Sequence, residues 1–205
     1  DEIRGRKGLF NRVMEGVELV KGRWPTLPIH FNVCVQKGVA DEVDGLVDLA
    51  TRMGVHVSFD VITEFRNAGE GQHFTETDMG LPLPELREVC SDLVARKRAG
   101  APIVNSESYF SYFADGRQGY RCHFPKLAMC VDGRGYFEDC MNLDRPIARV
   151  GEMPLKEVME LPRFKQLRKD AEGCCTCSSP TMVDMSRAWE DPQIFFSQGG
   201  ISLGA

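Results

Sequence analysis

The sequence predicts an α/β protein: βα units form a parallel sheet, and a small α+β cysteine-rich module with a β-hairpin follows. Three observations support this prediction. Amphipathic helices and short β-branched strands alternate up to about residue 119, with mostly short connections. Turn residues and two well-placed prolines then indicate a hairpin and two short helices. Finally, six of the eight cysteines lie between Cys122 and Cys177.

The composition is that of an ordinary globular protein, with 42% hydrophobic and 27% charged residues in a chain of 205. A net charge of −5 gives no reason to expect binding to nucleic acid or to a membrane surface. Neither a signal peptide nor an apolar run of transmembrane length is present in the sequence. Eight cysteines in such a chain indicate a reducing, cytoplasmic compartment, where clustered thiols more often hold metal than form disulfides. The alternative, a disulfide-bonded secreted domain, fits poorly with the crowding of Cys174, Cys175 and Cys177.

The helices of the first part are predicted from apolar residues that recur every three or four positions. In the second of them the recurring residues are Val43, Leu46, Val47 and Ala50. We expect Asp41 to be its N-cap and a glycine to end it. The same pattern predicts helices over residues 8–21, 41–53, 84–98 and 106–113.

Strands are predicted over residues 28–35, 55–62 and 101–104, where apolar and polar side chains alternate. In a barrel-like sheet one strand face meets the outer helices and the other faces the lumen. The lumen candidates are His30, Asn32, Cys34, Ser58 and Asp60. The polar loop 63–84 follows the second strand, so Thr63, Glu64 and Arg66 would lie at the barrel mouth, where such enzymes act. The alternative is that these are ordinary polar positions on a half-exposed antiparallel sheet.

The pattern changes from Tyr120 onward, and we place a boundary near Gly119. Residues 127–131 and 136–138, separated by a glycine-rich turn, predict a hairpin. Pro154 and Pro162 each mark the first turn of a short helix. A last helix is predicted over residues 181–189, and residues 198–205 are typical of a loose tail.

The cysteine spacing predicts a site of four thiolates. Cys174 and Cys177 form a Cys-x-x-Cys pair, which places two sulfurs on one tight turn. Cys122 precedes the predicted hairpin and Cys140 follows it. Because a hairpin returns the chain to its start, these two sulfurs should lie close together. Soft thiolates suit both an iron–sulfur cluster and structural zinc, and the spacing leaves both open.

The other cysteines have separate interpretations. Cys90 lies on an apolar helix stripe and is predicted to be a core residue. Cys34 fits either the core or the lumen. Cys130 is the substitute ligand if the set of four is wrong, and Cys175 is expected to turn its side chain away. His123, beside Cys122, is either a hydrogen-bond donor to a cluster sulfur or a surface side chain.

The second part has a particular spacing: twelve residues separate Cys122 from Gly135, four separate Gly135 from Cys140, and Cys174-x-x-Cys177 follows. This pattern resembles the auxiliary-cluster region of radical S-adenosylmethionine (SAM) enzymes. These regions are called SPASM domains or, in a shorter form, twitch domains. Residues 127–133 (LAMCVDG) resemble the hairpin between the first two ligands, and residues 153–158 (MPLKEV) resemble the helix that usually follows. No cysteine follows Cys177, so the resemblance is to the shorter form with one cluster.

Residues 1–10 are similar to the segment that follows the fourth barrel strand in these enzymes, so the resemblance covers nearly the whole chain. It implies that residues 1–119 are the C-terminal part of the radical SAM partial (β/α) TIM barrel, 120–190 the auxiliary-cluster module and 191–205 a tail. The family's Cys-x-x-x-Cys-x-x-Cys loop is absent from this sequence. We therefore expect that loop to lie in a missing N-terminal barrel half of the same protein, and this fragment alone to be inactive.

The resemblance implies an auxiliary [4Fe-4S] cluster on Cys122, Cys140, Cys174 and Cys177, with SAM and a second [4Fe-4S] cluster in the full-length parent. It also implies a peptide or small-molecule substrate modified through a 5′-deoxyadenosyl radical, and an electron donor such as flavodoxin or ferredoxin. Arg4 and Asn32 are its candidate contacts to SAM. From the residues alone, Arg4 is equally a solvated charge and Asn32 a residue that fills the barrel.

No catalytic residue is identified, although Asp60 and Glu64 are candidates for contact with substrate. The competing hypothesis is a zinc-stabilised four-cysteine interaction module without catalytic activity.

Overall fold

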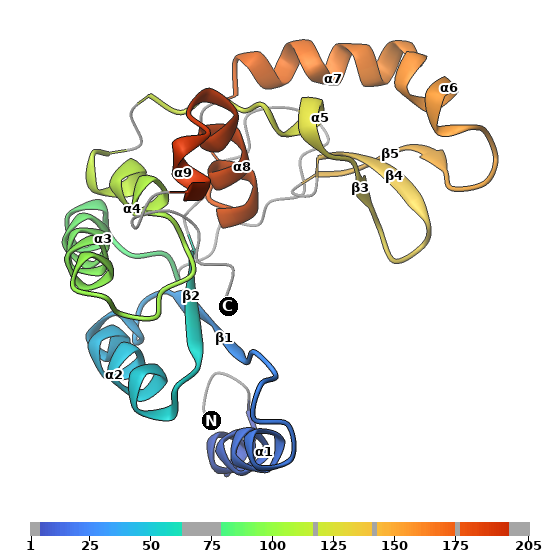
Figure 1. The fold of residues 1–205 in the computed structure, drawn as a ribbon. Coiled ribbons are helices and arrows are strands. Elements are labelled where there is room, and N and C mark those ends of the chain that lie inside the picture. Colours follow the sequence, from blue (N-terminus) through green and yellow to red (C-terminus); the bar gives the residue numbers. More distant parts are fainter. Residues whose placement is uncertain (1–4, 63–78, 117–118, 141–142, 175–176, 197–205) are drawn as a thin grey trace.

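The structure is a computed structural model that describes residues 5–62, 79–116, 119–140, 143–174 and 177–196, with only the backbone at 139, 140, 143–145 and 195. It is a mixed α/β chain with two small sheets. Figure 1 shows the elements arranged along an open crescent, with α1 at one end and α6 at the other. Of the helices that the structure describes, none combines the length and apolar character that crossing a membrane requires.

The N-terminal part alternates helices and strands, as the sequence predicts. Its strands β1 and β2 pair in parallel, with His30 opposite His56 and Val35 opposite Val61. The helix α2 between them is the crossover that a parallel pair requires. The elements are α1 (Leu9–Arg23), β1 (His30–Val35), η1 (Ala40–Glu42), α2 (Val43–Met53), β2 (His56–Val61), α3 (Leu83–Arg98) and α4 (Glu107–Ala114).

Two local predictions in this part are wrong. Asp41 does not cap α2: it lies inside the 3₁₀ turn η1, and α2 begins after Glu42 without a side-chain cap. Residues 101–104 do not form a full strand. They contribute a single parallel bridge between Ile103 and Val57, because the chain turns into the Ser106 N-cap of α4 almost at once.

The edge of β2 that faces away from β1 is closed. Val57 exchanges hydrogen bonds with the backbone of Pro102 and Val104, at 2.9 and 2.8 Å. The side chain of Asn105 then takes over, accepting from the Phe59 N–H at 2.7 Å and donating to its carbonyl at 3.1 Å. The hydroxyl of Tyr109 accepts a hydrogen bond from the Val61 N–H at 3.1 Å. Two side chains thus replace the rest of a third strand.

The opposite edge of the sheet, along β1, is open within the described residues. The sheet has the order β1-β2, and no described strand lies beyond β1. Ile29 and Val35 accept from the N–H groups of His56 and Ile62 at 2.9 and 3.1 Å. By the alternation of a parallel ladder, residues 30, 32 and 34 therefore turn their backbone groups toward the open edge.

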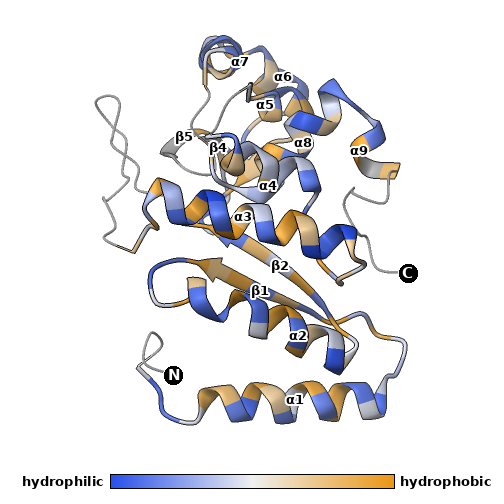
Figure 2. Ribbon diagram, turned by 90° about the vertical axis from the view of Figure 1, so that its left-hand side faces the viewer, coloured by the Kyte–Doolittle hydropathy of each residue, from blue (hydrophilic) through white to orange (hydrophobic). Residues whose placement is uncertain are grey.

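Helices α2 and α3 cover the outer face of this sheet (Figure 2). The core beneath them is apolar and closely packed, with Val35, Phe59, Leu93 and Ile103 fully buried. This face therefore provides stability, whereas His30, Asn32 and Cys34 lie on the exposed face of β1.

The C-terminal part contains an antiparallel sheet of order β3-β4-β5 and a series of helices. The predicted hairpin is confirmed, with a first strand shortened because Phe124–Leu127 forms a helical turn. Asp132 shapes the turn by accepting from the N–H groups of Arg134 and Tyr136 at 2.9 and 2.8 Å. The elements are α5 (Phe124–Leu127), β3 (Cys130–Val131), β4 (Tyr136–Cys140), β5 (Leu143–Arg149), α6 (Leu155–Glu160), α7 (Pro162–Glu172), α8 (Pro180–Glu190) and α9 (Gln193–Phe196).

Candidate functional site

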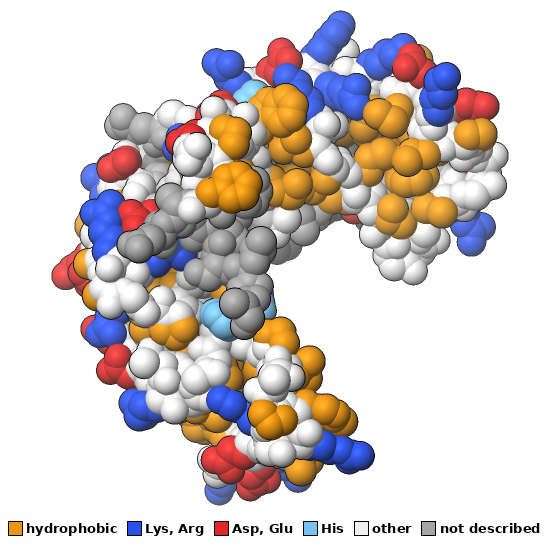
Figure 3. Space-filling view, viewed as in Figure 1, with side chains coloured by type: hydrophobic (Ala, Val, Ile, Leu, Met, Phe, Trp, Pro, Cys, Tyr) orange, Lys and Arg blue, Asp and Glu red, His pale blue; other side chains and the backbone are white. Residues whose placement is uncertain are grey.

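A polar surface lies on the inner face of the parallel sheet. The His30 ring and the Ser58 hydroxyl are 2.7 Å apart, and Asn32 donates to the Asp60 carboxylate at 3.1 Å. Cys34, next along β1, is exposed. These are the predicted lumen residues, and they line one continuous polar strip. Figure 3 shows that the molecule is hollowed between its two ends, on the side that this strip faces.

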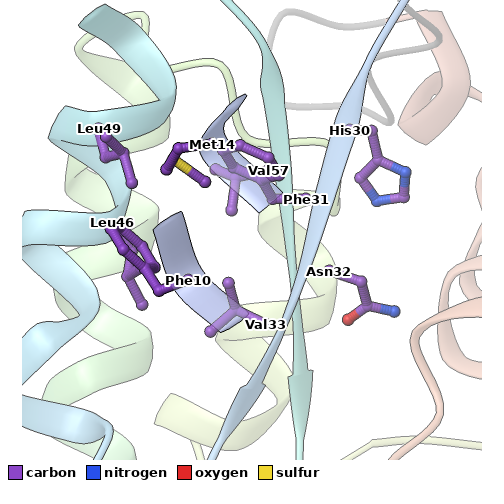
Figure 4. A pocket seen from close by; sticks show the side chains of 9 residues that line it. All are labelled: Phe10, Met14, His30, Phe31, Asn32, Val33, Leu46, Leu49 and Val57. Carbon is purple, nitrogen blue, oxygen red and sulfur yellow. The ribbon is translucent and has the colours of Figure 1, made fainter. Parts of the chain in front are cut away.

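The other side of β1 is apolar. Figure 4 shows Phe31, Val33 and Val57 facing helices α1 and α2, with Phe10 and Met14 among them, while His30 and Asn32 project from the opposite side. The space between these side chains forms a pocket lined mainly by apolar residues, together with His30 and Asn32. Because no charged or nucleophilic group projects into it from this side, we assign it to helix packing.

The cysteine region brings three of the four predicted ligands into one neighbourhood. The Cys122 N–H donates to the Cys174 carbonyl oxygen at 3.3 Å, so these two segments are directly joined. Cys122 and Cys177 are both buried free thiols, at 8% and 6% exposure. Cys174 is exposed. Tyr120 is buried beside them, and its pKa is raised first by burial and then by the thiols of Cys177 and Cys122.

Helix α8 holds this cysteine region in place. The Cys177 sulfur lies 3.6 Å from the Met182 sulfur. Four and eight residues later, Ser186 accepts from the His123 N–H at 2.9 Å and Glu190 lies 2.9 Å from the His123 ring. Residues spaced by four occupy one helical face. One face of α8 therefore contacts both ends of the cysteine segment.

His123 corrects a prediction. Its interpretation as a surface side chain is wrong, because it is 8% exposed and paired with Glu190. Its Nδ1 has no hydrogen-bond partner among the described residues.

A second contact joins α8 to the N-terminal part. The Asp184 carboxylate accepts from both the backbone N–H and the hydroxyl of Ser106, the N-cap of α4. Burial raises the pKa of Asp184 to about 6, although the bonds from Ser106 and the charge of Lys97 act in the opposite direction. Lys97 is also buried, and its ammonium donates to the Ile103 carbonyl at 2.7 Å. This polar cluster fixes α8 against α3 and α4.

Tyr109 connects the end of β2 directly to the cysteine segment. Its hydroxyl accepts from Val61 and donates to the carbonyl of Ser178, one residue past Cys177, at 2.8 Å. Aromatic rings continue the link, because consecutive ring centroids along one series lie 4.9–6.4 Å apart. That series is Phe59, Phe110, Tyr109, Phe113, Tyr112 and Tyr120.

The remaining cysteines have distinct positions. Cys140 ends β4, where it is paired with Leu143, and its side chain lies outside the described residues. Cys130 is half-buried on β3 opposite Glu138. Cys90 is a core residue, as predicted, and burial raises the pKa of its thiol to about 12. Such a thiol is unreactive at neutral pH.

Several candidates lie outside the described residues. Arg4, Thr63, Glu64, Arg66 and Cys175 are among them, so the predictions for these positions stay predictions.

The donor chemistry fits a metal centre, although the described thiols are not gathered as a preformed one. Within the described ranges, no three His, Cys, Asp or Glu side chains are arranged to hold an ion. The described cysteines form no disulfide, and three of them, Cys90, Cys122 and Cys177, are buried within one core cluster. Cysteine thiolates, two of them on a Cys-x-x-Cys turn, are ligands that iron–sulfur clusters and zinc use.

Four residues that organise the site carry no sequence signal of their own. Asn105, Tyr109, Tyr120 and Asp184 act through contacts that span much of the chain. The one usable signal is a polar residue in an apolar stretch, as with Asn105 after Ile103 and Val104.

Comparison with known protein families, with curated proteins and with solved structures finds no match for this chain.

Proposed function

We propose that this chain is part of a radical SAM enzyme. In this proposal it supplies the last βα units of the partial barrel and a twitch-type module with one auxiliary [4Fe-4S] cluster. The cluster ligands are Cys122, Cys140, Cys174 and Cys177. The substrate class is a peptide or a small metabolite.

The observation that carries the proposal is the convergence of Cys122, Cys174 and Cys177. Two distant segments join through the backbone bond from Cys122 to Cys174, and Cys122 and Cys177 are buried in the same core cluster. Cys140 ends the hairpin strand that leads back from the turn. In the proposal, these three segments supply the four sulfurs that a cubane cluster needs.

The sheet provides independent support. Its β2 edge is closed while its β1 edge is open within the described residues, as expected if further βα units pair with β1. The polar strip of His30, Asn32, Ser58 and Asp60 faces the hollow. In the proposal Asn32, held by Asp60, contacts SAM from this strip, and the missing N-terminal barrel half supplies the cluster that binds SAM.

The chain's own residues would hold and shield the group. When bound, an auxiliary iron–sulfur cluster supplies electron transfer or a contact to substrate. Cys122 and Cys177 would hold it from the buried side. The Met182, Ser186 and Glu190 face of α8 fixes both segments. Tyr109 ties the cluster segment to the end of β2, beside the polar strip.

Anaerobic reconstitution with iron and sulfide tests the proposal. We expect the chain to bind a full [4Fe-4S] complement and to show broad visible absorption from sulfur-to-iron charge transfer. Cys140→Ala and Cys177→Ala should each lose most of this absorption. Cys34→Ser removes an exposed thiol far from the site in sequence and is the matched control.

Zinc is the informative competing outcome. A colourless chain that binds one zinc tightly, folds fully and takes up no iron would overturn the cluster proposal in favour of a structural four-cysteine module.

A further inference from the structure

One tyrosine hydroxyl bonds both to the parallel sheet and to the cysteine region. Tyr109 is fully buried on α4, and its hydroxyl accepts from the Val61 N–H at 3.1 Å and donates to the Ser178 carbonyl at 2.8 Å. Ser178 directly follows Cys177, the last of the candidate ligands. A hydroxyl has a single proton, so the bond to Ser178 sets the direction in which the oxygen can accept from Val61. The two bonds therefore depend on each other.

On the sheet side, Val61 leads directly to the polar strip. It is the last residue of β2, and Asp60 precedes it on the strand and accepts from the Asn32 amide at 3.1 Å. The ends of strands open more easily than their centres, so the bond from Val61 to Tyr109 holds the part of β2 that is most prone to open. Whatever fixes the Tyr109 hydroxyl thus also restrains the backbone next to Asp60.

On the cysteine side, metal would add a strong restraint. In the metal-free chain the Cys177 sulfur lies 3.6 Å from the Met182 sulfur, a contact between a weak donor and a weak acceptor. A metal–thiolate bond is much stronger, because the free energy of binding a structural metal is free energy of folding for the segment that holds it. Since Ser178 is the next residue, its carbonyl would be fixed together with Cys177.

We propose that metal loading of the cysteine region stabilises the end of β2, and with it Asp60 of the polar strip, through the Tyr109 hydroxyl. The inference rests on the proposed function for the metal centre at the cysteines, and on the two bonds of one hydroxyl for the link. Coupling between two sites is reciprocal, so a contact that orders the polar strip would in turn tighten metal binding. In the proposed enzyme the strip would be fully ordered only when the auxiliary site is loaded.

Hydrogen exchange resolved to single amides tests this link. It compares the metal-free chain with the chain loaded with Zn²⁺ and with the chain reconstituted anaerobically with iron and sulfide. Val57 is the internal reference, because its N–H lies on the same edge of β2 but bonds to the Pro102 carbonyl. Loading should slow exchange at Val61 by at least about fivefold more than at Val57, the lower end of typical coupling between sites. A general gain in stability would slow both amides alike.

Two variants locate the link at one hydroxyl. Tyr109→Phe keeps the aromatic ring, so loading should still protect residues 177–179, but the extra slowing at Val61 should be lost. Tyr112→Phe is the matched control, because it removes a hydroxyl from another buried tyrosine of α4, and it should keep the extra slowing. The comparison of Val61 with Val57 in the wild-type chain needs no variant, so it decides the inference even if Tyr109→Phe folds poorly.

Three outcomes overturn the inference. Equal slowing at Val57 and Val61 in the wild-type chain would show that metal stabilises the fold as a whole. Extra slowing at Val61 that survives in Tyr109→Phe, or that is lost equally in Tyr112→Phe, would remove the Tyr109 hydroxyl from the link. Finally, a wild-type chain that binds neither zinc nor a cluster has no metal centre to couple.

The proposed function fails separately. If the wild-type chain takes up zinc but no cluster, the cluster proposal is rejected, and the exchange comparison in the zinc form still decides whether loading acts on β2.

Discussion

The two edges of the parallel sheet contrast sharply. Along β2, the backbone groups that face away from β1 have partners. A short backbone bridge serves Val57. The side chain of Asn105 serves Phe59, and that of Tyr109 serves the Val61 N–H. Along β1, the described residues contribute no pairing strand. One edge is built to end the sheet, whereas the other keeps the row of donors and acceptors that a further strand requires.

The residue that closes the β2 edge also contacts the cysteine region. The same Tyr109 hydroxyl that closes the β2 edge donates to Ser178, beside Cys177. The closed edge is therefore continuous with the candidate metal site. Four predictions test this comparison, in decreasing order of expected effect.

The largest effect is expected for Asn105→Ala. Asn105 is 3% exposed, and the substitution leaves the Phe59 N–H and carbonyl buried without partners. We expect a loss of about 3 kcal/mol in the free energy of unfolding, measured by urea denaturation. Asn32→Ala, on the exposed polar strip, is the matched control and should change stability by less than about 0.5 kcal/mol. Equal losses in the two variants would remove the distinction between the edges.

Tyr109→Phe should have the next largest effect. The ring contacts survive, but the Val61 N–H and the Ser178 carbonyl both lose their partner. We expect a loss of about 2 kcal/mol. Hydrogen exchange should speed up at Val61 and in residues 177–179 together. Faster exchange at only one of these places would show that the hydroxyl does not couple them.

A smaller effect concerns the pH dependence of the α4–α8 contact. Burial raises the pKa of Asp184 to about 6 in the folded chain, above its unfolded value, so the folded state binds the proton more tightly. This contribution to stability is fully present below the unfolded pKa and is lost as pH rises through about 6. Between pH 5 and pH 7 the wild-type chain should lose about 1 kcal/mol from this group.

Asp184→Asn is the variant that isolates this effect. It keeps a polar side chain next to Ser106 but cannot titrate, so this part of the pH dependence should vanish in thermal unfolding scans. A variant with the same slope as the wild type would assign the pH dependence to another group.

The smallest effect is expected at the open edge. Cys34 is exposed, and its N–H faces away from β2, so Cys34→Pro removes a donor that no described strand uses. We expect it to cost at least about 1 kcal/mol less than Val33→Pro, which breaks a ladder bond to β2. Circular dichroism during urea unfolding measures both. A Cys34→Pro variant as unstable as Val33→Pro would show that the edge is already occupied.

The fold of the N-terminal part is largely readable from its sequence because its signals are local. Alternation in β1 and the apolar stripe of α2 depend on residues a few positions apart, and both elements agree with the prediction. The strand predicted at 101–104 shows the limit. Its composition suits a strand, but Asn105 substitutes a side chain for the ladder, and no local pattern reveals that exchange.

In the candidate site, too, the local features could be predicted from the sequence and the distant contacts could not. The Cys-x-x-Cys spacing singles out Cys174 and Cys177, and the hairpin signal is local and correct. The sequence pattern does not predict the strand β5, because the proline at position 146 within it is typical of a loop. Proline is tolerated there since β5 is an edge strand. The burial of His123 and the roles of Tyr120 and Asp184 come from α8, and the sequence gives no direct indication of such distant contacts.

Helix α8 also affects when the candidate site can assemble. Its bonds to Ser106 and His123 join residues 78, 63 and 67 positions apart, and α8 leaves the ribosome after every cysteine of the chain. Contacts over such separations form late, after the locally coded helices. Until α8 docks, Cys177 lacks its contact with Met182, and His123, next to Cys122, lacks its bonds to Ser186 and Glu190. In the proposed function, the order of synthesis would therefore leave a brief period in which these ligands are open to whatever delivers the metal.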